Sequence, residues 1–379
     1  MPKIMFSVGE ASGDLHGANV AKAIKKVCPE AKLFGMGGQM MREAGVEIVY
    51  DIAGLGVIGL VEVIKNLPKF FKLRSFLADI MDKEKPDVLV IIDYPGFNMK
   101  LAKVAKNKNI PIVSYISPSA WAWGKGRAKE MAGLVNMVAA IFPFEAKVYE
   151  EAGANVTFVG HPLLDVVKPS MTKEESYEYF EASPDNPILM LMPGSREQEI
   201  ENLLTPMVKS CENIAKVLPN CQFYLPVAST ISLEMIESKI SASSAKIRLT
   251  KADDKNYDLM NIADVAIASS GTATLELALL QVPSVIIYRV VPLTYYLGKI
   301  LVKIPNIGLP NIIAGRKIMP ELLQNQITVE NITQEALKLL NNQEVKDKVL
   351  TDLEEVRQKL GNPGALERVA EVILSFAKK

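Results

Sequence analysis

Short apolar runs alternate with segments of helical periodicity along the first half of the chain. A continuous run such as Asp87–Ile92 (DVLVII) is typical of a parallel strand that helices cover on both faces. The other strands predicted in this half are residues 3–8, 32–35, 110–115, 137–141 and 156–159. Helices are predicted between them, for example at residues 17–27, 99–108 and 126–134. This alternation predicts a doubly wound parallel sheet of the α/β class.

The pattern restarts after residues 162–187, a stretch with several prolines and many charges. The strands predicted in the second half are residues 188–192, 222–227, 246–250, 265–268 and 284–288. Helices separate these strands, and three more are predicted near residues 334–341, 345–360 and 365–376. We therefore predict two Rossmann-like domains, residues 1–165 and 166–361, with an interdomain cleft and with ligand sites at the turns that follow the strands.

The composition of the 379-residue chain narrows the classes of function that the protein can have. Lys+Arg and Asp+Glu both number 43, so the formal net charge is zero and nucleic-acid binding is not indicated. The cysteines and histidines show no metal-ligand spacing, so we expect no zinc site. The first residues are expected to form a strand rather than a signal peptide, and no run approaches the ~18 apolar residues of a membrane span. Any membrane contact is therefore expected to be peripheral.

Two turns of the first half carry carboxylates. The turn Gly9–Gly17 (GEASGDLHG) places Glu10 and Asp14 in a glycine-rich mouth suited to binding sugar hydroxyls or taking a proton. Alternatively, Asp14 complements the dipole at a helix N-terminus. Asp93 directly follows a buried strand, and a carboxylate partly removed from water has a raised pKa, which favours a general base. Alternatively, Asp93 caps a helix that begins at Met99.

A third turn of the first half, residues 117–131 (SPSAWAWGKGRAKEM), holds both tryptophans of the chain. Trp121 and Trp123 lie there beside Lys125 and Arg127. Aromatic faces next to cations suit a sugar ring that carries a phosphate. Core packing of the tryptophans beside a solvated basic helix face is the alternative.

Two turns of the second half suit phosphate. Gly194 and Ser195 offer backbone amides at a helix N-terminus, and Arg196 suits a bidentate contact with a pyrophosphate. A capping box around Ser195 is the alternative. The other turn, residues 268–279 (ASSGTATLELAL), combines small hydroxyl residues with glycine before a helix, a pattern typical of an anion-binding nest. It has no P-loop lysine, which argues against an ATPase and favours a diphosphate held by backbone dipoles. Its residues are Ser270, Gly271 and Thr272, followed by Glu276, which suits ribose hydroxyls or is a solvated helix charge. The second domain is thus expected to hold a nucleotide diphosphate and the first an acceptor.

Two longer segments are further candidates. Residues 307–324 are an irregular stretch expected to face a ligand, with the polar residues Asn311, Glu321 and Gln324. Residues 54–77 mix apolar side chains with basic ones, which suits a helix that dips into anionic lipid or accepts acyl chains. An ordinary core helix is the alternative, but adjacent Phe70 and Phe71 cannot both face one narrow core stripe. The basic residues of this segment are Lys65, Lys69 and Lys72.

In their order along the chain, these motifs resemble the lipid-A-disaccharide synthase family, whose members are GT-B glycosyltransferases of family 19. The blocks are GEASGDLHGA, FGMGGQMM, IDYPGFN, SPSAWAWGKGR, FPFE, VGHPLLD, LMPGSREQEI, SSGTATLELAL and LPNIIAGRKIMPELLQ. The resemblance implies an inverting transfer from UDP-2,3-diacylglucosamine to the 6-hydroxyl of 2,3-diacylglucosamine 1-phosphate (lipid X). The products would be UDP and the β-1′,6-linked lipid A disaccharide 1-phosphate.

The resemblance also implies a peripheral enzyme on the cytoplasmic face of the inner membrane of a Gram-negative bacterium, with no metal or other cofactor. It implies a homodimer and a last helix, residues 362–379, that crosses back to the first domain. Asp93 is implied to be the base, although many relatives have a second acid where this chain has Gly96, and Glu10 and Asp14 are reserve candidates. The residues implied to bind the donor are Gly194, Ser195, Arg196, Ser270, Gly271, Thr272, Glu276, Asn311, Glu321 and Gln324.

Two other classes of protein fit a two-lobed α/β chain. A soluble UDP-sugar 2-epimerase would need no lipid surface, and the basic, apolar segment at residues 54–77 argues against it. A non-catalytic sugar-binding protein would usually carry a signal peptide, which the first residues do not resemble.

Overall fold

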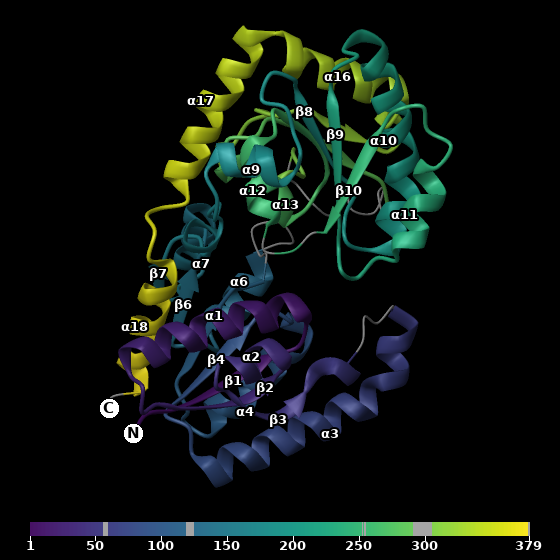
Figure 1. Ribbon diagram of the computed structural model, residues 1–379. Coiled ribbons are helices and arrows are strands. Elements are labelled where there is room, and N and C mark those ends of the chain that lie inside the picture. Colours follow the sequence, from purple (N-terminus) through teal and green to yellow (C-terminus); the bar gives the residue numbers. More distant parts are fainter. Residues whose placement is uncertain (56–59, 119–124, 252, 254, 291–304, 378–379) are drawn as a thin grey trace. The chain divides into compact units, whose positions relative to one another are not determined.

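The computed structural model describes residues 1–55, 60–118, 125–251, 253, 255–290 and 305–377 (Figure 1). The chain divides into two compact units. The first consists of Met1–Asp165 and Leu360–Lys379, and the second of Val166–Lys359. Both units are built on a parallel sheet with helices between the strands, so the predicted α/β class with two Rossmann-like units is confirmed.

The first unit contains a seven-stranded sheet in the order β3-β2-β1-β4-β5-β6-β7. All neighbouring strands are parallel. The strands are β1 (Lys3–Val8), β2 (Lys32–Gly37), β3 (Glu47–Asp51), β4 (Val88–Ile92), β5 (Ile112–Tyr115), β6 (Met137–Ala140) and β7 (Val156–Phe158). The order reverses between β1 and β4, and ligands of doubly wound sheets bind outside the carboxyl ends of strands at such a switch point.

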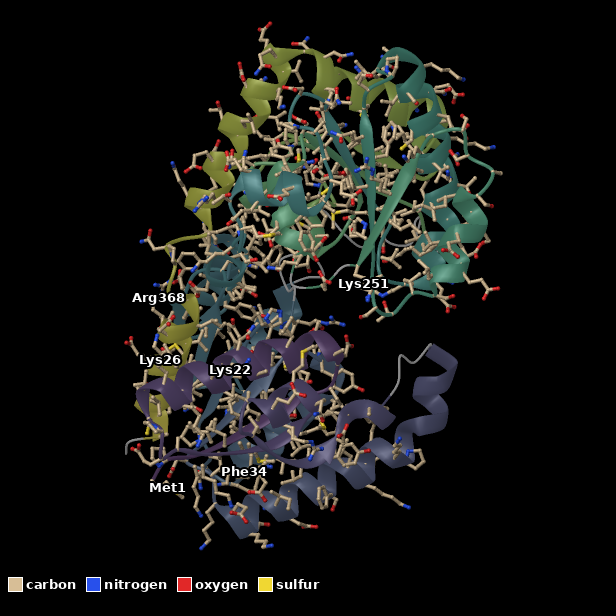
Figure 2. All side chains as sticks on the ribbon, in the orientation of Figure 1. Met1, Lys22, Lys26, Phe34, Lys251 and Arg368 are labelled. Carbon is tan, nitrogen blue, oxygen red and sulfur yellow. The ribbon has the colours of Figure 1, made fainter. Side chains whose placement is uncertain are left out.

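Helices cover this sheet and include one from the far end of the chain. They are α1 (Ala11–Val27), α2 (Gln39–Glu43), α3 (Leu60–Glu84), α4 (Pro95–Asn107), α6 (Lys125–Ala132), α7 (Pro143–Glu151) and α18 (Ala365–Ala377). Helix α18 lies beside α1, where Lys26 pairs with Glu367 at 3.4 Å, and Arg368 donates to the Val159 carbonyl at 2.7 Å (Figures 1 and 2). These contacts hold the last helix in the first unit.

The second unit contains a six-stranded sheet in the order β10-β9-β8-β11-β12-β13. Its strands, all parallel, are β8 (Ile188–Met192), β9 (Gln222–Val227), β10 (Ile247–Lys251), β11 (Val265–Ser269), β12 (Ser284–Tyr288) and β13 (Glu321–Leu323). Its helices are α9 (Lys173–Tyr179), α10 (Glu197–Val217), α11 (Leu233–Ile240), α12 (Asn256–Ile262), α13 (Thr272–Leu279), α15 (Leu309–Ala314), α16 (Val329–Asn341) and α17 (Gln343–Lys359). The short helix α8 (Leu163–Val166) lies at the junction of the units. The switch point of this sheet lies between β8 and β11.

Several helices begin earlier than the apolar pattern predicted. Helix α1 begins at Ala11 rather than Gly17, and α4 begins at Pro95 rather than Met99. Proline is tolerated in the first helical turn because the amide it lacks has no partner there. Gly13 and Gly17 both lie within α1, and other side chains pack tightly against them. An added Cβ would lie 2.8 Å from Val8 at Gly13 and 2.6 Å from Met41 at Gly17.

Candidate functional site

The turn after β4 holds Asp93 in a strained conformation. Asp93 and Tyr94 have φ angles of 50° and 49°, in the left-handed region that side chains rarely adopt. The Asp93 amide donates to the Ile116 carbonyl at 3.2 Å, and Asn98 Nδ2 donates to the Asp93 carbonyl at 2.8 Å. Consecutive residues of this kind persist only where surrounding bonds fix them, and they cluster at functional sites.

The Asp93 side chain is half-buried, and this burial raises its pKa, while the hydrogen bond from the Tyr94 amide opposes the shift. A raised pKa suits a carboxylate that accepts a proton near neutrality. The alternative in which Asp93 caps a helix at Met99 is wrong. Helix α4 begins at Pro95, and its N-cap residue Tyr94 follows Asp93.

The turns that follow β1 and β4 meet at the switch point of the sheet. The Tyr94 ring lies over Gly9 so closely that an added Cβ would be 2.1 Å from Tyr94 Cδ1. Burial, followed by the negative charge of Glu10, raises the pKa of the Tyr94 hydroxyl. The exposed Glu10 and the half-buried Asp93 therefore flank Tyr94, so two of the predicted carboxylates lie in one region.

In the same region, Asp14 binds backbone amides of a neighbouring helix. Its buried carboxylate accepts hydrogen bonds from the amides of Gly38, Met40 and Met41 at 2.7, 2.9 and 3.2 Å. One of the two alternatives placed Asp14 at a helix N-terminus, and Asp14 does lie in the first turn of α1. The amides that it binds, however, are those at the start of the neighbouring helix α2. Three amide bonds hold the Asp14 carboxylate in place, so its role in the structure is to fix the start of α2.

Residues 119–124 of the tryptophan turn lie outside the described residues. Trp121 and Trp123 fall there, and the side chain of Lys125 at the start of α6 is likewise not described. Arg127 on α6 is exposed. The prediction of a sugar-binding surface on this turn stays a prediction.

In the second unit, an internal carboxylate occupies the amides that follow β8. Glu199 Oε2 accepts hydrogen bonds from the amides of Ser195 and Arg196 at 3.0 and 3.2 Å, and Arg196 Nη1 lies 3.4 Å from Glu199 Oε1. Gly194 has φ +119°, and an added Cβ would lie 2.1 Å from Glu199 Oε2. The turn therefore binds a carboxylate, as an anion site should. The N-cap of α10 is Arg196, so the alternative of a capping box around Ser195 is wrong. Glu199 binds the N-cap amide, but the Arg196 side chain has no acceptor to complete such a box.

The turn after β11 has no side-chain cap within the part of the chain that the structure describes. Gly271 is the N-cap of α13, and both Gly271 and Thr272 are exposed. Ser270 donates from Oγ to the Ile307 carbonyl at 3.1 Å. One turn into α13, half-buried Glu276 accepts a hydrogen bond from Tyr257 Oη at 3.3 Å, and burial raises its pKa. Open amides at a helix N-terminus are suited to a phosphate group.

Asn311 and Glu321 form a closed hydrogen-bond network. Asn311 Nδ2 donates to the Met319 carbonyl and to Glu321 Oε1 at 2.9 and 2.7 Å, and Asn311 Oδ1 accepts from the amides of Ile318 and Met319. Glu321 Oε1 also accepts from the Gly308 amide at 2.9 Å. Both side chains are buried, and these bonds fix the segment around α15.

Gln324 follows β13 with φ 52°, and it is half-buried. Strand β13 itself was expected to be irregular. A contact between the donor and any of Asn311, Glu321 and Gln324 stays a prediction.

The two adjacent phenylalanines of helix α3, Phe70 and Phe71, face in different directions. Phe70 is partly buried, packs against the core of the first unit, and lies 6.5 Å from Tyr94 between ring centroids. Phe71 points outward, with 53% of its surface exposed, and Arg74 stacks on its ring at 5.1 Å. Lys69 and Lys72 are exposed, and the side chain of Lys65 is not described. The helix is therefore a core helix on one face, while its other face carries exposed apolar and basic residues.

Several residues around these turns were not predicted from sequence. They are Asn98, which holds the Asp93 carbonyl, Glu199, which occupies the phosphate turn, and Tyr257, which contacts Glu276. None of the three has a clear sequence signal, since the capping-box pattern that starts at Ser195 points to Gln198 rather than to Glu199. Within the residues described, no cluster of three or more His, Cys, Asp or Glu side chains is placed to hold a metal ion. None of the described helices meets the length and apolarity needed to cross a bilayer.

Comparison with known proteins identifies the family. The family profile described as lipid-A-disaccharide synthetase matches residues 4–374. The lipid-A-disaccharide synthase of Geobacter metallireducens is 43% identical over 377 residues, covering 100% of this chain and 98% of the relative. That of Coxiella burnetii is 41% identical over 370 residues, covering 98% and 97%. The chain therefore belongs to the lipid-A-disaccharide synthase family and is a glycosyltransferase, so the prediction from sequence is confirmed.

Solved structures of other enzymes share the fold. A putative UDP-N-acetylglucosamine 2-epimerase from Listeria monocytogenes has a TM-score of 0.68 at 14% identity, covering 98% of this chain and 96% of that one. The MurG of Acinetobacter baumannii has a TM-score of 0.61 at 15% identity, covering 99% and 100%. At such identities the likeness shows the GT-B fold alone, so the epimerase alternative has no support beyond the fold.

Proposed function

We propose that this chain transfers the acylated glucosamine of UDP-2,3-diacylglucosamine to the 6-hydroxyl of 2,3-diacylglucosamine 1-phosphate, with inversion at the anomeric carbon. The match to the family profile over residues 4–374 is the observation that carries this proposal. The fold by itself would not distinguish this reaction from those of other enzymes with the same architecture.

Asp93 is the proposed base. The 6-oxygen of the acceptor attacks the anomeric carbon, the bond between that carbon and the phosphate oxygen breaks, and UDP leaves with the electron pair. The proton of the 6-hydroxyl passes to the Asp93 carboxylate. The raised pKa and the rigid turn between β4 and α4 support this role, because a base needs both proton affinity and a fixed position.

The second unit is proposed to bind the UDP group. The uncapped N-terminus of α13 offers amides at Gly271 and Thr272 to a phosphate, and Glu276 is placed one turn away for ribose hydroxyls. Arg196, whose side chain is 76% exposed, is proposed to stabilise the charge that develops on the departing diphosphate. For this, Glu199 must release the amides of Ser195 and Arg196.

Membrane attachment is proposed to be peripheral, at the cytoplasmic face of the inner membrane, through the exposed face of α3. Phe71 supplies apolar surface there, and Lys69, Lys72 and Arg74 supply positive charge for anionic lipid. A homodimer is proposed as the working assembly on the basis of the family resemblance.

An assay of UDP release tests the proposed function. Release is expected only when UDP-2,3-diacylglucosamine and 2,3-diacylglucosamine 1-phosphate are both present, with one disaccharide formed for each UDP. Equal release without the acceptor, or with unacylated sugars, would exclude the proposed transfer.

A further inference from the structure

An open groove lies beside α3 in the first unit, and none of the catalytic steps above uses it. Tyr50 of β3 lines it together with a stretch of α3 that contains Pro68, Lys69, Lys72, Leu73 and Phe76. Its volume is about 380 Å³. Sites for small molecules typically have ~300–1,000 Å³, so the groove is large enough for part of a ligand.

The periodicity of α3 explains how the groove forms. Leu73 and Leu77 are buried in the core of the first unit, 3% and 0% exposed. The neighbouring stripe carries Lys69, Lys72 and Phe76, which are spaced by three and four residues and so lie along one side of the helix. Helix α3 bends near its beginning (Figure 1), and Pro68 inside the helix supplies the cause.

The chemistry of this stripe matches an anionic lipid molecule. Lys69 and Lys72 place two ammonium groups about one turn apart, which suits a phosphate. Phe76 lies one turn further on, with 41% of its apolar side chain exposed, and Leu73 and Tyr50 form the adjoining apolar wall. Basic groups at one end and apolar surface at the other fit a single molecule that joins a phosphate to an acyl chain.

The groove and the turn that holds Asp93 pack against the same core. Tyr50, which lines the groove, and Tyr94 both pack against the core cluster of the first unit. Phe70, which follows Lys69 on α3, packs on Tyr94 with the ring centroids 6.5 Å apart. Tyr94 is the neighbour of Asp93 in the chain, so the groove is linked to the proposed catalytic turn through these packed rings.

We propose that the α3 groove is the acceptor subsite that binds the 1-phosphate and one acyl chain, with Lys72 contacting the phosphate and Phe76 the chain. The identity of the acceptor rests on the proposed function, whereas the chemical class, an acyl-chain phosphate, follows from the groove itself. The subsite shares Lys69 and Lys72 with the exposed face of α3 but does not include Phe71, which is proposed to contact bulk lipid.

Binding of dodecyl phosphate below its critical micelle concentration, measured by calorimetry, tests the subsite without requiring catalysis. Lys72→Glu and Phe76→Ser are each expected to weaken binding at least tenfold. The matched control is Lys83→Glu, on the last turn of the same helix, and it is expected to bind as the unmodified protein does. Dodecyl maltoside, which has the same chain and a neutral headgroup, is expected to bind at least tenfold more weakly.

Steady-state kinetics distinguish the subsite from the proposed function. Lys72→Glu and Phe76→Ser are expected to raise the KM for the acceptor about tenfold and to leave the KM for the UDP donor unchanged. Dodecyl phosphate binding that depends on Lys72 in a protein without transferase activity would refute the proposed function and keep the groove as an acyl-phosphate site. Equal losses with Lys72→Glu and Lys83→Glu, or no binding at all, would overturn the groove proposal itself.

Discussion

The side-chain amide of Asn98 holds the main-chain carbonyl of Asp93, with Nδ2 donating at 2.8 Å. The same Nδ2 also faces the carbonyls of Ser7 and Ile92 at 3.1 and 3.3 Å, and Asn98 Oδ1 accepts from Ser7 Oγ at 2.6 Å. One buried side chain thus ties the ends of β1 and β4 to the start of α4. The position of the proposed base depends on this link, because the turn it fixes is strained.

Asp93→Asn is expected to lower kcat by about 10²–10⁴-fold, because the substituted amide cannot take the proton from the acceptor hydroxyl. UDP affinity, measured by calorimetry, is expected to be unchanged. Asp79→Asn, on the exposed surface of α3, is the matched control and is expected to keep full turnover. Turnover of Asp93→Asn within threefold of the unmodified enzyme would remove Asp93 as the base.

The pH profile gives a second readout of Asp93. Burial raises its pKa, and the base works only when ionised, so kcat/KM is expected to fall as pH drops through a pKa above the usual ~3.9 of an aspartate. The folded protein then holds this proton to a higher pH than the unfolded chain does. Ionisation of Asp93 therefore destabilises the fold as pH rises through that interval, and Asp93→Asn is expected to be at least as stable at neutral pH. A marked loss of stability in this variant would contradict the burial argument.

Asn98→Ala is expected to lower the free energy of unfolding by about 2–4 kcal/mol, since the substitution leaves buried carbonyls and the Ser7 hydroxyl without their partner. It is also expected to lower kcat with little change in UDP affinity, because the Asp93 turn loses its anchor while the second unit is untouched. Denaturant unfolding and steady-state kinetics check the two effects. Normal kcat in the folded Asn98→Ala protein would show that the turn keeps its geometry without this anchor.

Glu199→Gln is expected to tighten UDP binding by about three- to tenfold. The carboxylate now holds the amides of Ser195 and Arg196, and a neutral carboxamide, which accepts hydrogen bonds more weakly, competes less with the diphosphate. Glu197→Gln makes the same charge change on the same turn, without an amide contact to lose, and is the control. Arg196→Ala is expected to act in the opposite direction and weaken binding. Equal effects of Glu197→Gln and Glu199→Gln on UDP affinity would show that only net charge matters and would contradict competition by Glu199 for the amides.

Phe71→Ser is expected to reduce partitioning onto vesicles that contain phosphatidylglycerol by several-fold, because it removes exposed apolar surface flanked by basic residues. Phe70→Ser is expected to lower stability instead, since its ring packs in the core beside Tyr94. Sedimentation with vesicles and thermal unfolding separate the two. Unchanged partitioning of Phe71→Ser would place the membrane contact elsewhere.

The sequence predicts the central strands well because their burial on both faces produces continuous apolar runs. Strands β3 and β13, each at the edge of a sheet, were missed. Strand β3 is half-buried or exposed along its length and begins and ends with the charged residues Glu47 and Asp51, so it carries no clear apolar signal. Strand β13 has three residues, too few to show a pattern, although two of them are buried.

For the candidate site, the sequence indicates which turns carry candidate residues. The partners of individual side chains were not predictable, because they depend on backbone angles and on residues distant in the sequence. Asp14 and Gly38 are 24 residues apart, yet their contact decides that Asp14 anchors α2. Similarly, the two phenylalanines of α3 were correctly expected to face different ways, but only the packing shows that Phe70 is the inner one.

The position of UDP tests most directly whether the second unit holds the nucleotide. In a crystal structure of the protein with UDP, we expect the diphosphate at the amides of Gly271 and Thr272 and beside the Arg196 guanidinium, with Glu199 displaced from the Ser195 amide. UDP bound instead at the Asp93 turn of the first unit, with Glu199 still on the Ser195 amide, would contradict the proposed division between the two units.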